Sequence, residues 1–291
     1  MAHVANTFQL GRDLSVNRLG YGAMRLTGQP GNFGCYADWE AGQQLLRRAI
    51  ELGVNFIDTA ESYGPGYNEE LIASALYPYP DDLIIATKGG VLKTTPDNIR
   101  ADGSSKSLRR SCEASLQRLK VDAIDLYQLH RPDPSMPFSE SIGMLSELQR
   151  EGKIRHIGLS NVTIAQIEAA QKIVEVASVQ NRLNLAERSG EDILDFCTQH
   201  NIAFIPYAPL GAHPLKRGAP LANPEGVLTE IAAHHGMKPN QIALAWILHR
   251  ASNIILIPGT TTISHLEENI AAASIALTTN DLKLLGEAHA L

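Results

Sequence analysis

The chain has 291 residues, of which 44% are hydrophobic, and 25 basic and 31 acidic side chains give it a formal net charge of −6. This composition is typical of a globular protein, and its acidic balance argues against a nucleic-acid or membrane partner. No apolar stretch approaches the roughly 18 residues of a membrane span, no signal peptide is recognisable, and Cys35, Cys112 and Cys197 form no CxxC motif, so we expect a cytoplasmic protein without disulfides.

Short apolar runs of strand type recur along the whole chain. Each is largely apolar and is too short for a helix of ordinary length. The eight runs are 18–24, 54–58, 83–88, 123–130, 154–160, 176–180, 203–209 and 253–259.

Helical patterns separate these runs. In 40–52, the residues Leu45, Leu46, Ala49 and Ile50 share one face, and a glycine follows as a natural end. Similar patterns cover 105–119, 139–151, 164–173, 189–200, 225–236, 239–250 and 279–289.

Strands that alternate with helices eight times predict parallel βαβ units. Eight units in a chain of this length favour a closed (β/α)8 TIM barrel with additional helices over an open doubly wound sheet. We find no linker, so we predict a single domain over residues 1–291. The loop 210–224 is long and rich in Gly and Pro, which indicates either a functional or a disordered segment.

Ionisable residues end three consecutive runs: Asp58, Lys88 and His130. Tyr63 follows Asp58 in the next loop. Because catalytic groups of barrels lie at the carboxyl ends of the strands, we expect these four side chains to converge.

The chemistry of the four residues is mutually consistent. An ammonium lowers the pKa of a nearby tyrosine, so we expect Lys88, paired with Asp58, to act in this way on Tyr63. A proton donor beside an oxygen-binding histidine, with no nucleophile, suits reduction of a carbonyl by hydride from a cofactor.

Each of these residues also has a purely structural interpretation. Asp58 and Lys88 fit an internal ion pair, His130 fits a buried core histidine, and the segment after Tyr63 fits a turn. A metal site is a poorer fit, because His130 has no second histidine at ligand spacing. The conjunction of the four residues on neighbouring strand ends is what favours catalysis.

Longer motifs surround these residues along nearly the full chain. They are NFIDTAESYG with NEEL at 68–71, IIATKGG at 84–90, SLQRLKVDAIDLYQLHRPDP at 115–134, GKIRHIGLSN at 152–161, PYAPLG at 206–211, and IPGT followed by HLEENIAA. Together these motifs resemble those of the aldo-keto reductases. The stretches RLGYGAMRLTG and ALYPYPDDL resemble in detail those of a bacterial subgroup that includes pyridoxal reductases.

The resemblance implies a barrel that binds NADPH and reduces aldehydes or ketones. It implies a catalytic tetrad of Asp58, Tyr63, Lys88 and His130, with Tyr63 as the general acid. It implies cofactor contacts by Gly22, Ala23 and Met24, Asp58, Ser160, Asn161, Gln180, Tyr207, Ala208, Leu210, Gly211, Lys216, Gly259, Thr260, Thr261, Thr262, His265, Glu268 and Asn269.

The cofactor pocket departs from the family pattern at two positions. Many members place a lysine or arginine where this chain has Gly259 and His265, so the expected preference for NADPH is modest and NADH is an alternative cofactor. Lys216 or Arg217, in the loop after the seventh strand, is expected to offset part of this loss by reaching the pyrophosphate.

The expected substrate is a small carbonyl compound, and the resemblance to the subgroup that includes pyridoxal reductases implies pyridoxal as the first candidate. No long C-terminal loop of the kind found in members with strict substrate choice follows the last helix, so we expect an open pocket mouth. The segment 27–39 and the loop after His130 are then expected to shape that pocket. The runner-up function is a cofactor-sensing regulatory subunit of the same fold, and a barrel hydrolase or isomerase is a third. We expect a monomer, because no oligomer-specifying stripe is evident.

Overall fold

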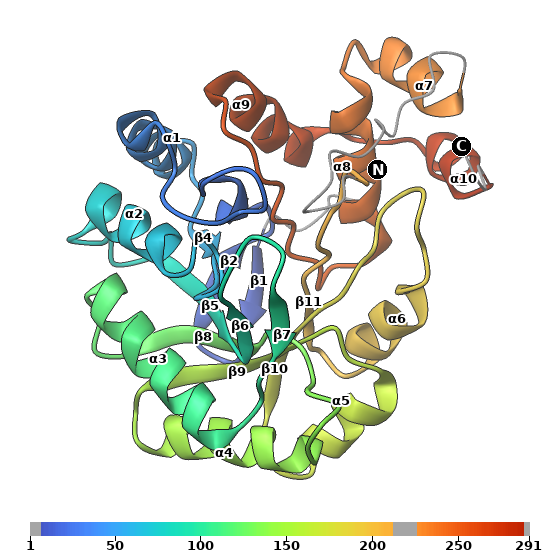
Figure 1. Cartoon of the computed structure of the whole chain (residues 1–291). Helices are drawn as coiled ribbons and strands as arrows, with labels where there is room; N and C mark the ends of the chain where they lie inside the picture. The colour runs from blue at the N-terminus through green and yellow to red at the C-terminus, as the bar shows by residue number, and fades with distance from the viewer. Residues whose placement is uncertain (1–6, 212–225, 288–291) are drawn as a thin grey trace.

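A ring of parallel strands lies at the centre of the molecule, and helices pack around its outside (Figure 1). The computed structural model describes residues 7–211 and 226–287. Seven strands form one sheet in the order β11-β10-β9-β8-β5-β4-β3, with every pair parallel. Their bounds are β3 Tyr21–Gly22, β4 Phe56–Asp58, β5 Ile84–Gly89, β8 Ile124–Leu129, β9 Ile154–Ser160, β10 Val176–Gln180 and β11 Ala203–Phe204.

The segment 253–256 closes the ring between β11 and the residues before β3. Ile255 N donates to the carbonyl oxygen of Phe204 at 2.9 Å, and Leu256 N donates to that of Arg18 at 2.8 Å. The eighth predicted strand is therefore present as a segment held by isolated bridges on both sides. Closure in this way confirms the predicted (β/α)8 barrel.

Helices fill the connections between the strands. α1 (Trp39–Glu51) begins where the Asp38 carboxylate accepts a hydrogen bond from Ala41 N at 3.0 Å, and it buries Leu45 and Leu46. The other described helices are η1 Ala23–Arg25, α2 Tyr67–Leu76, α3 Ser105–Leu119, α4 Phe138–Arg150, α5 Ile164–Gln171, α6 Glu191–Gln199, α7 Val227–His235, α8 Pro239–Arg250, α9 Ile263–Ala271, η2 Ala272–Ser274 and α10 Thr279–Glu287. All eight predicted helical patterns correspond to helices.

α2 is absent from the predicted patterns. Its buried residues include Asn68 and Glu69 as well as Leu71 and Ile72. Two polar side chains on the inward face interrupt the apolar stripe by which an amphipathic helix is recognised. The helix is therefore specified by polar contacts that the local sequence does not display.

Two antiparallel hairpins were also not predicted. β1 (Thr7–Leu10) and β2 (Leu14–Asn17) form the first hairpin. Asp13 in its turn accepts a hydrogen bond from Arg155 near the start of β9 at 2.8 Å, which places it at the amino ends of the strands. β6 (Val91–Lys93) and β7 (Ile99–Ala101) form the second, which follows β5 directly and lies at the carboxyl ends.

Side chains alternate between the barrel interior and the surrounding helices, as the pleat of a strand dictates. Ile84 and Ala86 of β5 pack in the interior with Phe56 of β4, whereas Ile85 packs outward against α1 and α2. The same period of two directs Lys88 into the interior, where it is fully buried. The barrel interior is thus apolar toward the amino ends of the strands and polar toward their carboxyl ends.

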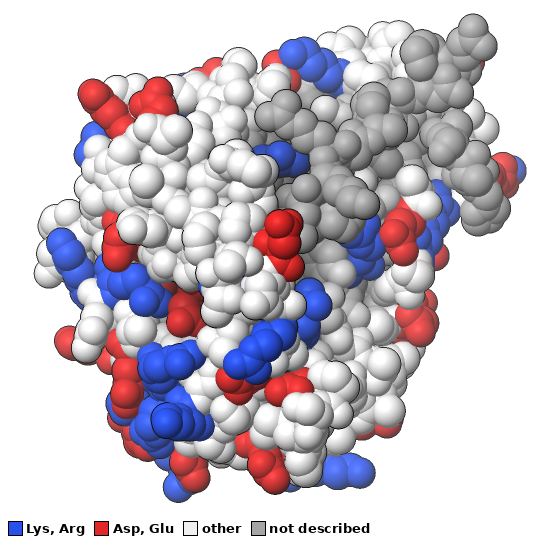
Figure 2. All heavy atoms as spheres, viewed as in Figure 1, with Lys and Arg blue, Asp and Glu red and all other residues white. Residues whose placement is uncertain are grey.

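Charged side chains of both signs are interspersed on the face shown in Figure 2. Between α3 and the end of α4, Arg109 pairs with Glu151 at 2.7 Å and Lys153 pairs with Glu113 at 2.6 Å. Exposed pairs of this kind contribute about 0–1 kcal/mol each.

Within residues 7–211 and 226–287, none of the helices combines the length and the apolar character needed to cross a bilayer.

Candidate active site

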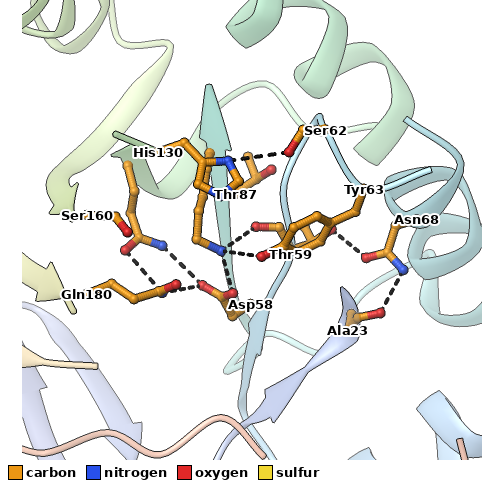
Figure 3. Close-up of polar contacts among 12 residues, drawn as sticks. Ala23, Asp58, Thr59, Ser62, Tyr63, Asn68, Thr87, His130, Ser160 and Gln180 are labelled. Carbon is orange, nitrogen blue, oxygen red and sulfur yellow. Dashed lines mark hydrogen bonds and ion pairs between the residues drawn. The ribbon is translucent and has the colours of Figure 1, made fainter. Parts of the chain in front are cut away.

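Four ionisable side chains meet at the carboxyl ends of three neighbouring strands (Figure 3). Asp58 is the last residue of β4, Lys88 lies one residue before the end of β5, and His130 follows β8. Tyr63 lies in the turn between β4 and α2. The structure therefore brings together the four residues that the sequence analysis grouped, because parallel neighbouring strands end at the same edge.

The Lys88 ammonium is the centre of this group. It donates to Asp58 Oδ1 at 2.5 Å and to the carbonyl oxygen of Thr59 at 2.9 Å. Its third contact is the Tyr63 hydroxyl at 3.5 Å. An ammonium has three hydrogens, so each has an acceptor. Burial lowers the pKa of Lys88, but the Asp58 carboxylate and Tyr63 more than offset this and raise it overall. Lys88 therefore stays positively charged.

The second oxygen of Asp58 is held by two buried amides. Asp58 Oδ2 accepts from Gln128 Nε2 at 3.1 Å and from Gln180 Nε2 at 2.8 Å. Because an ionised carboxylate only accepts hydrogen bonds, both glutamines must turn their nitrogens toward it. The orientation of the Gln180 amide is thus fixed by the same carboxylate that holds Lys88.

The pKa of Tyr63 differs in direction from the expectation. Burial raises it, the Lys88 ammonium lowers it and the Asp58 carboxylate raises it, which leaves the pKa above its usual value. The expected net lowering is wrong for this structure, because burial outweighs the ammonium. The phenol is therefore protonated at neutral pH, and Lys88 reduces the penalty for its ionisation.

His130 stands beside Tyr63 with the two rings in an edge-to-face arrangement, their centroids 5.9 Å apart. Its Nδ1 lies 3.4 Å from the Ser62 hydroxyl. Burial, followed by the charges of Lys88 and Arg131, lowers the pKa of His130 well below that of free histidine. The imidazole is therefore neutral at physiological pH.

Amide and hydroxyl groups continue the site to the end of β9 and to the segment after β11. Asn161, with a φ of 57°, donates through Nδ2 to the carbonyl oxygen of His130 and to Ser160 Oγ, both at 3.0 Å. Its Oδ1 accepts from the Tyr207 hydroxyl at 2.9 Å. Ser160 and Asn161 from one motif and Tyr207 from another thus form one connected group next to His130.

The first and last segments of the barrel approach closely at two glycines. A Cβ on Gly22 would lie 2.5 Å from the carbonyl oxygen of Ile257, and one on Gly259 would lie 2.6 Å from the carbonyl oxygen of Gly22. Neither position tolerates a side chain without movement of the backbone. Arg25 Cγ lies 3.8 Å from that same Cβ position of Gly259, so the aliphatic part of an arginine not foreseen from the sequence lies next to the position where many family members carry a cation.

The remaining predicted cofactor residues lie around the start of α9. Thr260 Oγ1 accepts from Thr262 N at 3.1 Å, and Tyr21 donates to the carbonyl oxygen of Thr260 at 2.6 Å. Thr261, Thr262 and His265 are exposed. The first turn of α9 is therefore open to solvent and has no acidic residue.

Glu268 and Asn269 lie one turn farther along α9. Lys238 pairs with the Glu268 carboxylate, and Asn269 is buried. Ala23 is buried and Met24 is partly exposed in η1, whereas Ala208, Leu210 and Gly211 are partly exposed after β11. Lys216 and Arg217 lie outside the described residues.

Five further polar residues around the site were not predicted: Arg25, Thr59, Ser62, Asn68 and Gln128. A signal was available for Gln128, which lies two residues before His130 and therefore on the same face of its strand. Asn68 had a weaker one, as a polar residue in the NEEL motif. Thr59 acts through its backbone oxygen, which residue type does not reveal.

The family comparison covers almost the whole chain. A model described as "Aldo/keto reductase family" matches residues 18–290. An uncharacterized oxidoreductase of Schizosaccharomyces pombe is 44% identical over 98% of this chain and 90% of that protein. Pyridoxine 4-dehydrogenase of Escherichia coli is 41% identical over 97% of each chain.

Solved structures share the fold. A crystal structure of an aldo-keto reductase from Klebsiella pneumoniae in complex with NADPH superimposes with a TM-score of 0.81 at 29% identity, covering 98% of this chain and 94% of that one. The barrel and the arrangement of its strand ends are therefore common to both proteins.

Proposed function

This chain belongs to the aldo/keto reductase family and is an NAD(P)H-dependent oxidoreductase, and from that premise we propose that it reduces an aldehyde or ketone to an alcohol with NADPH as hydride donor and Tyr63 as proton donor. The observation that carries the proposal is the position of the buried Lys88 ammonium, 3.5 Å from the Tyr63 hydroxyl and 2.5 Å from Asp58 Oδ1. A cation so placed stabilises the phenolate that forms when Tyr63 gives up its proton.

The residues present fit a nicotinamide dinucleotide. The fixed amide orientation of Gln180, with its nitrogen on Asp58, leaves its oxygen to accept from a carboxamide, and Ser160 and Asn161 lie on the next strand. The close approach of the backbones at Gly22 and Gly259 leaves a surface without side chains on which the nicotinamide would lie. The exposed amino end of α9 suits a phosphate, since unpaired N–H groups and the helix dipole favour an anion there.

NADPH, when bound, supplies the hydride that reduces the carbonyl carbon. Tyr63 donates its hydroxyl proton to the carbonyl oxygen, and Lys88 stabilises the phenolate that remains. Asp58 holds Lys88 in place and balances its charge. Solvent then returns a proton to Tyr63 and restores the neutral phenol.

His130 orients the substrate in this scheme. His130 Nδ1 lies 3.4 Å from the Ser62 hydroxyl. In the tautomer that accepts from this hydroxyl, the ring hydrogen of the neutral imidazole is on Nε2 and donates to the carbonyl oxygen. A neutral donor polarises the carbonyl without placing a second full charge next to Lys88. Tyr63 and His130 together then hold the same oxygen from two sides.

We propose pyridoxal as the first substrate to test, since the similarity to pyridoxine 4-dehydrogenase extends over 97% of each chain. For the cofactor we propose NADPH in preference to NADH. Arg25, next to Gly259, is proposed to supply part of the positive charge that family members carry at that position. A single domain, a monomeric state and a cytoplasmic location also remain proposals.

Oxidation of NADPH and NADH, followed by absorbance across a panel of aldehydes that includes pyridoxal and a dicarbonyl, tests this function. Tyr63→Phe is expected to lower kcat by at least about 100-fold, within the range for loss of a general acid, with little change in the Kd for NADPH. Tyr79→Phe is the matched control, because it removes one tyrosine hydroxyl that donates to the carbonyl oxygen of Leu119 at 2.7 Å, away from the site.

Equal rates in Tyr63→Phe and the wild type would remove Tyr63 from its role. Tight NADPH binding by the wild type without turnover of any aldehyde would refute the reductase and favour a cofactor-sensing subunit.

A further inference from the structure

The buried side chain of Asn68, at the start of α2, joins three segments of the site (Figure 3). Its Nδ2 donates to the carbonyl oxygens of Ala23 at 2.9 Å and Leu26 at 2.8 Å. Its Oδ1 accepts from the Thr59 hydroxyl at 2.6 Å. Both amide hydrogens and the amide oxygen are therefore engaged in bonds between different loops.

The two carbonyl acceptors frame η1, the single turn that follows β3. This turn begins next to Gly22, whose backbone meets Gly259 of the adjacent last barrel segment, and it contains Ala23 and Met24. Under the proposed function these residues form the floor on which the nicotinamide lies. The Asn68 amide thus fixes the position of η1 relative to α2.

The third bond leads to the proton donor. Thr59, whose hydroxyl is bound to Asn68, offers its carbonyl oxygen to the Lys88 ammonium at 2.9 Å. The backbone N of Asn68 also donates to the carbonyl oxygen of Tyr63 at 3.3 Å. Asn68 therefore contacts Tyr63 directly through the backbone and reaches Lys88 through Thr59.

α2 is a firm support for these contacts. Glu69, the next residue, is buried, and its Oε1 accepts from Thr87 Oγ1 at 2.6 Å while its Oε2 accepts from Arg118 Nε at 2.7 Å. Thr87 directly precedes Lys88 on β5. The start of α2 is therefore bound to β5, the strand that carries the Lys88 ammonium. The contacts of Glu69 with β5 and α3 thus fix the backbone next to Asn68, while the Asn68 side chain binds η1 and Thr59.

We propose that Asn68 is a positioning residue that sets the distance between the hydride donor and the proton donor. The inference rests on the proposed reductase function, since it assigns Ala23 and Met24 to the cofactor and Tyr63 to proton transfer. Only an amide of this length can donate twice and accept once in this geometry. An ionised aspartate has the same shape but offers no hydrogen to the two carbonyl groups.

Asn68→Asp is expected to lower kcat by about 10- to 100-fold, because a displacement of about 1 Å between reacting groups costs up to about 100-fold in rate. The Kd for NADPH is expected to change by less than about threefold, since most cofactor contacts lie on other segments. The ratio of the variant rate to the wild-type rate is expected to rise as the pH falls, because a protonated Asp regains one donor. A purely structural role would not produce this pH dependence.

Asn253→Asp is the matched control. Asn253 is also buried, accepts from a threonine hydroxyl, Thr198 Oγ1, at 2.9 Å, and donates to the carbonyl oxygen of Ile202 at 2.8 Å. It lies at the amino end of the last barrel segment, away from the site. Its substitution is expected to lower the Tm to a similar extent and leave kcat within about twofold of the wild type.

Thr59→Val provides a milder variant if Asn68→Asp does not fold, because it removes only the hydroxyl that binds Asn68 Oδ1 and keeps the backbone oxygen that binds Lys88. It is expected to lower kcat with unchanged NADPH affinity. A fall in kcat no larger than that of Asn253→Asp, or a loss confined to NADPH affinity, would overturn the positioning role. Absence of turnover in the wild type would instead refute the reductase function itself.

Discussion

Replacement of Lys88 by methionine tests two effects of the buried ion pair, one on the unfolding free energy and one on kcat. The side chains of Lys88 and Asp58 are 0% and 3% exposed, and their charged atoms are 2.5 Å apart. Removing one partner of a buried pair costs about 3–5 kcal/mol, because the other charge is left without compensation. Asp58 keeps its amide bonds from Gln128 and Gln180, so we expect the lower end, about 3 kcal/mol.

The same substitution has a separate effect on catalysis. At the 3.5 Å between Lys88 Nζ and the Tyr63 hydroxyl, a full phenolate charge would be attracted by about 5 kcal/mol at an effective dielectric constant of about 20. With about half of that charge developed in the transition state, the loss is about 2–3 kcal/mol. This corresponds to roughly a 100-fold decrease in kcat.

Urea unfolding and steady-state kinetics measure the two effects independently. Lys88→Met combined with Asp58→Asn is expected to regain at least half of the lost unfolding free energy, since no charge remains buried, while its activity stays low. Lys153→Met, which breaks a partly exposed pair with Glu113, is the control and is expected to lose about 0–1 kcal/mol. A double variant no more stable than Lys88→Met would refute the argument that an uncompensated carboxylate causes the loss.

Two further predictions concern pH and cofactor choice. Because burial and nearby cations lower the pKa of His130 well below that of free histidine, kcat is expected to show no transition near pH 6.5, and a transition there that disappears in His130→Gln would contradict a neutral imidazole. The unfolded chain binds this proton more readily than the folded one, so the unfolding free energy is expected to decrease as the pH falls below about 6.5. His265→Arg, at an exposed position in the first turn of α9, is expected to lower the Kd for NADPH by more than that for NADH, and an equal change in both would place the 2′-phosphate elsewhere.

The periodicity of the sequence was sufficient to predict the barrel. Short apolar runs and helical patterns with a period near 3.6 are local properties of the sequence, and all eight predicted helical patterns correspond to helices. The grouping of Asp58, Lys88 and His130 followed from the same logic, because the carboxyl ends of parallel strands must meet at one edge. Tyr63 was included because it lies only five residues after Asp58.

The elements missed were those whose stability comes from distant contacts. α2 has an inward face made partly of Asn68 and Glu69, so it lacks an apolar stripe and depends on partners in η1, β5 and α3. The eighth strand is held by backbone bonds to Phe204 and Arg18, and its sequence gives no sign that it remains a set of bridges. The two hairpins are too short to stand out from their surroundings.

The sequence by itself was sufficient to predict a barrel and to group four candidate catalytic residues at one end of it, since the apolar runs, and the polar residues at or just after their ends, are local features of the chain. Only the tertiary structure decided how those residues are partnered. Gln180 binds Asp58 from 122 positions away, and burial, not the neighbouring ammonium, sets the direction of the shift in the pKa of Tyr63. Hydrogen-bond partners and solvent exclusion depend on which atoms surround a group in space, and chain order does not specify that neighbourhood until the barrel has closed.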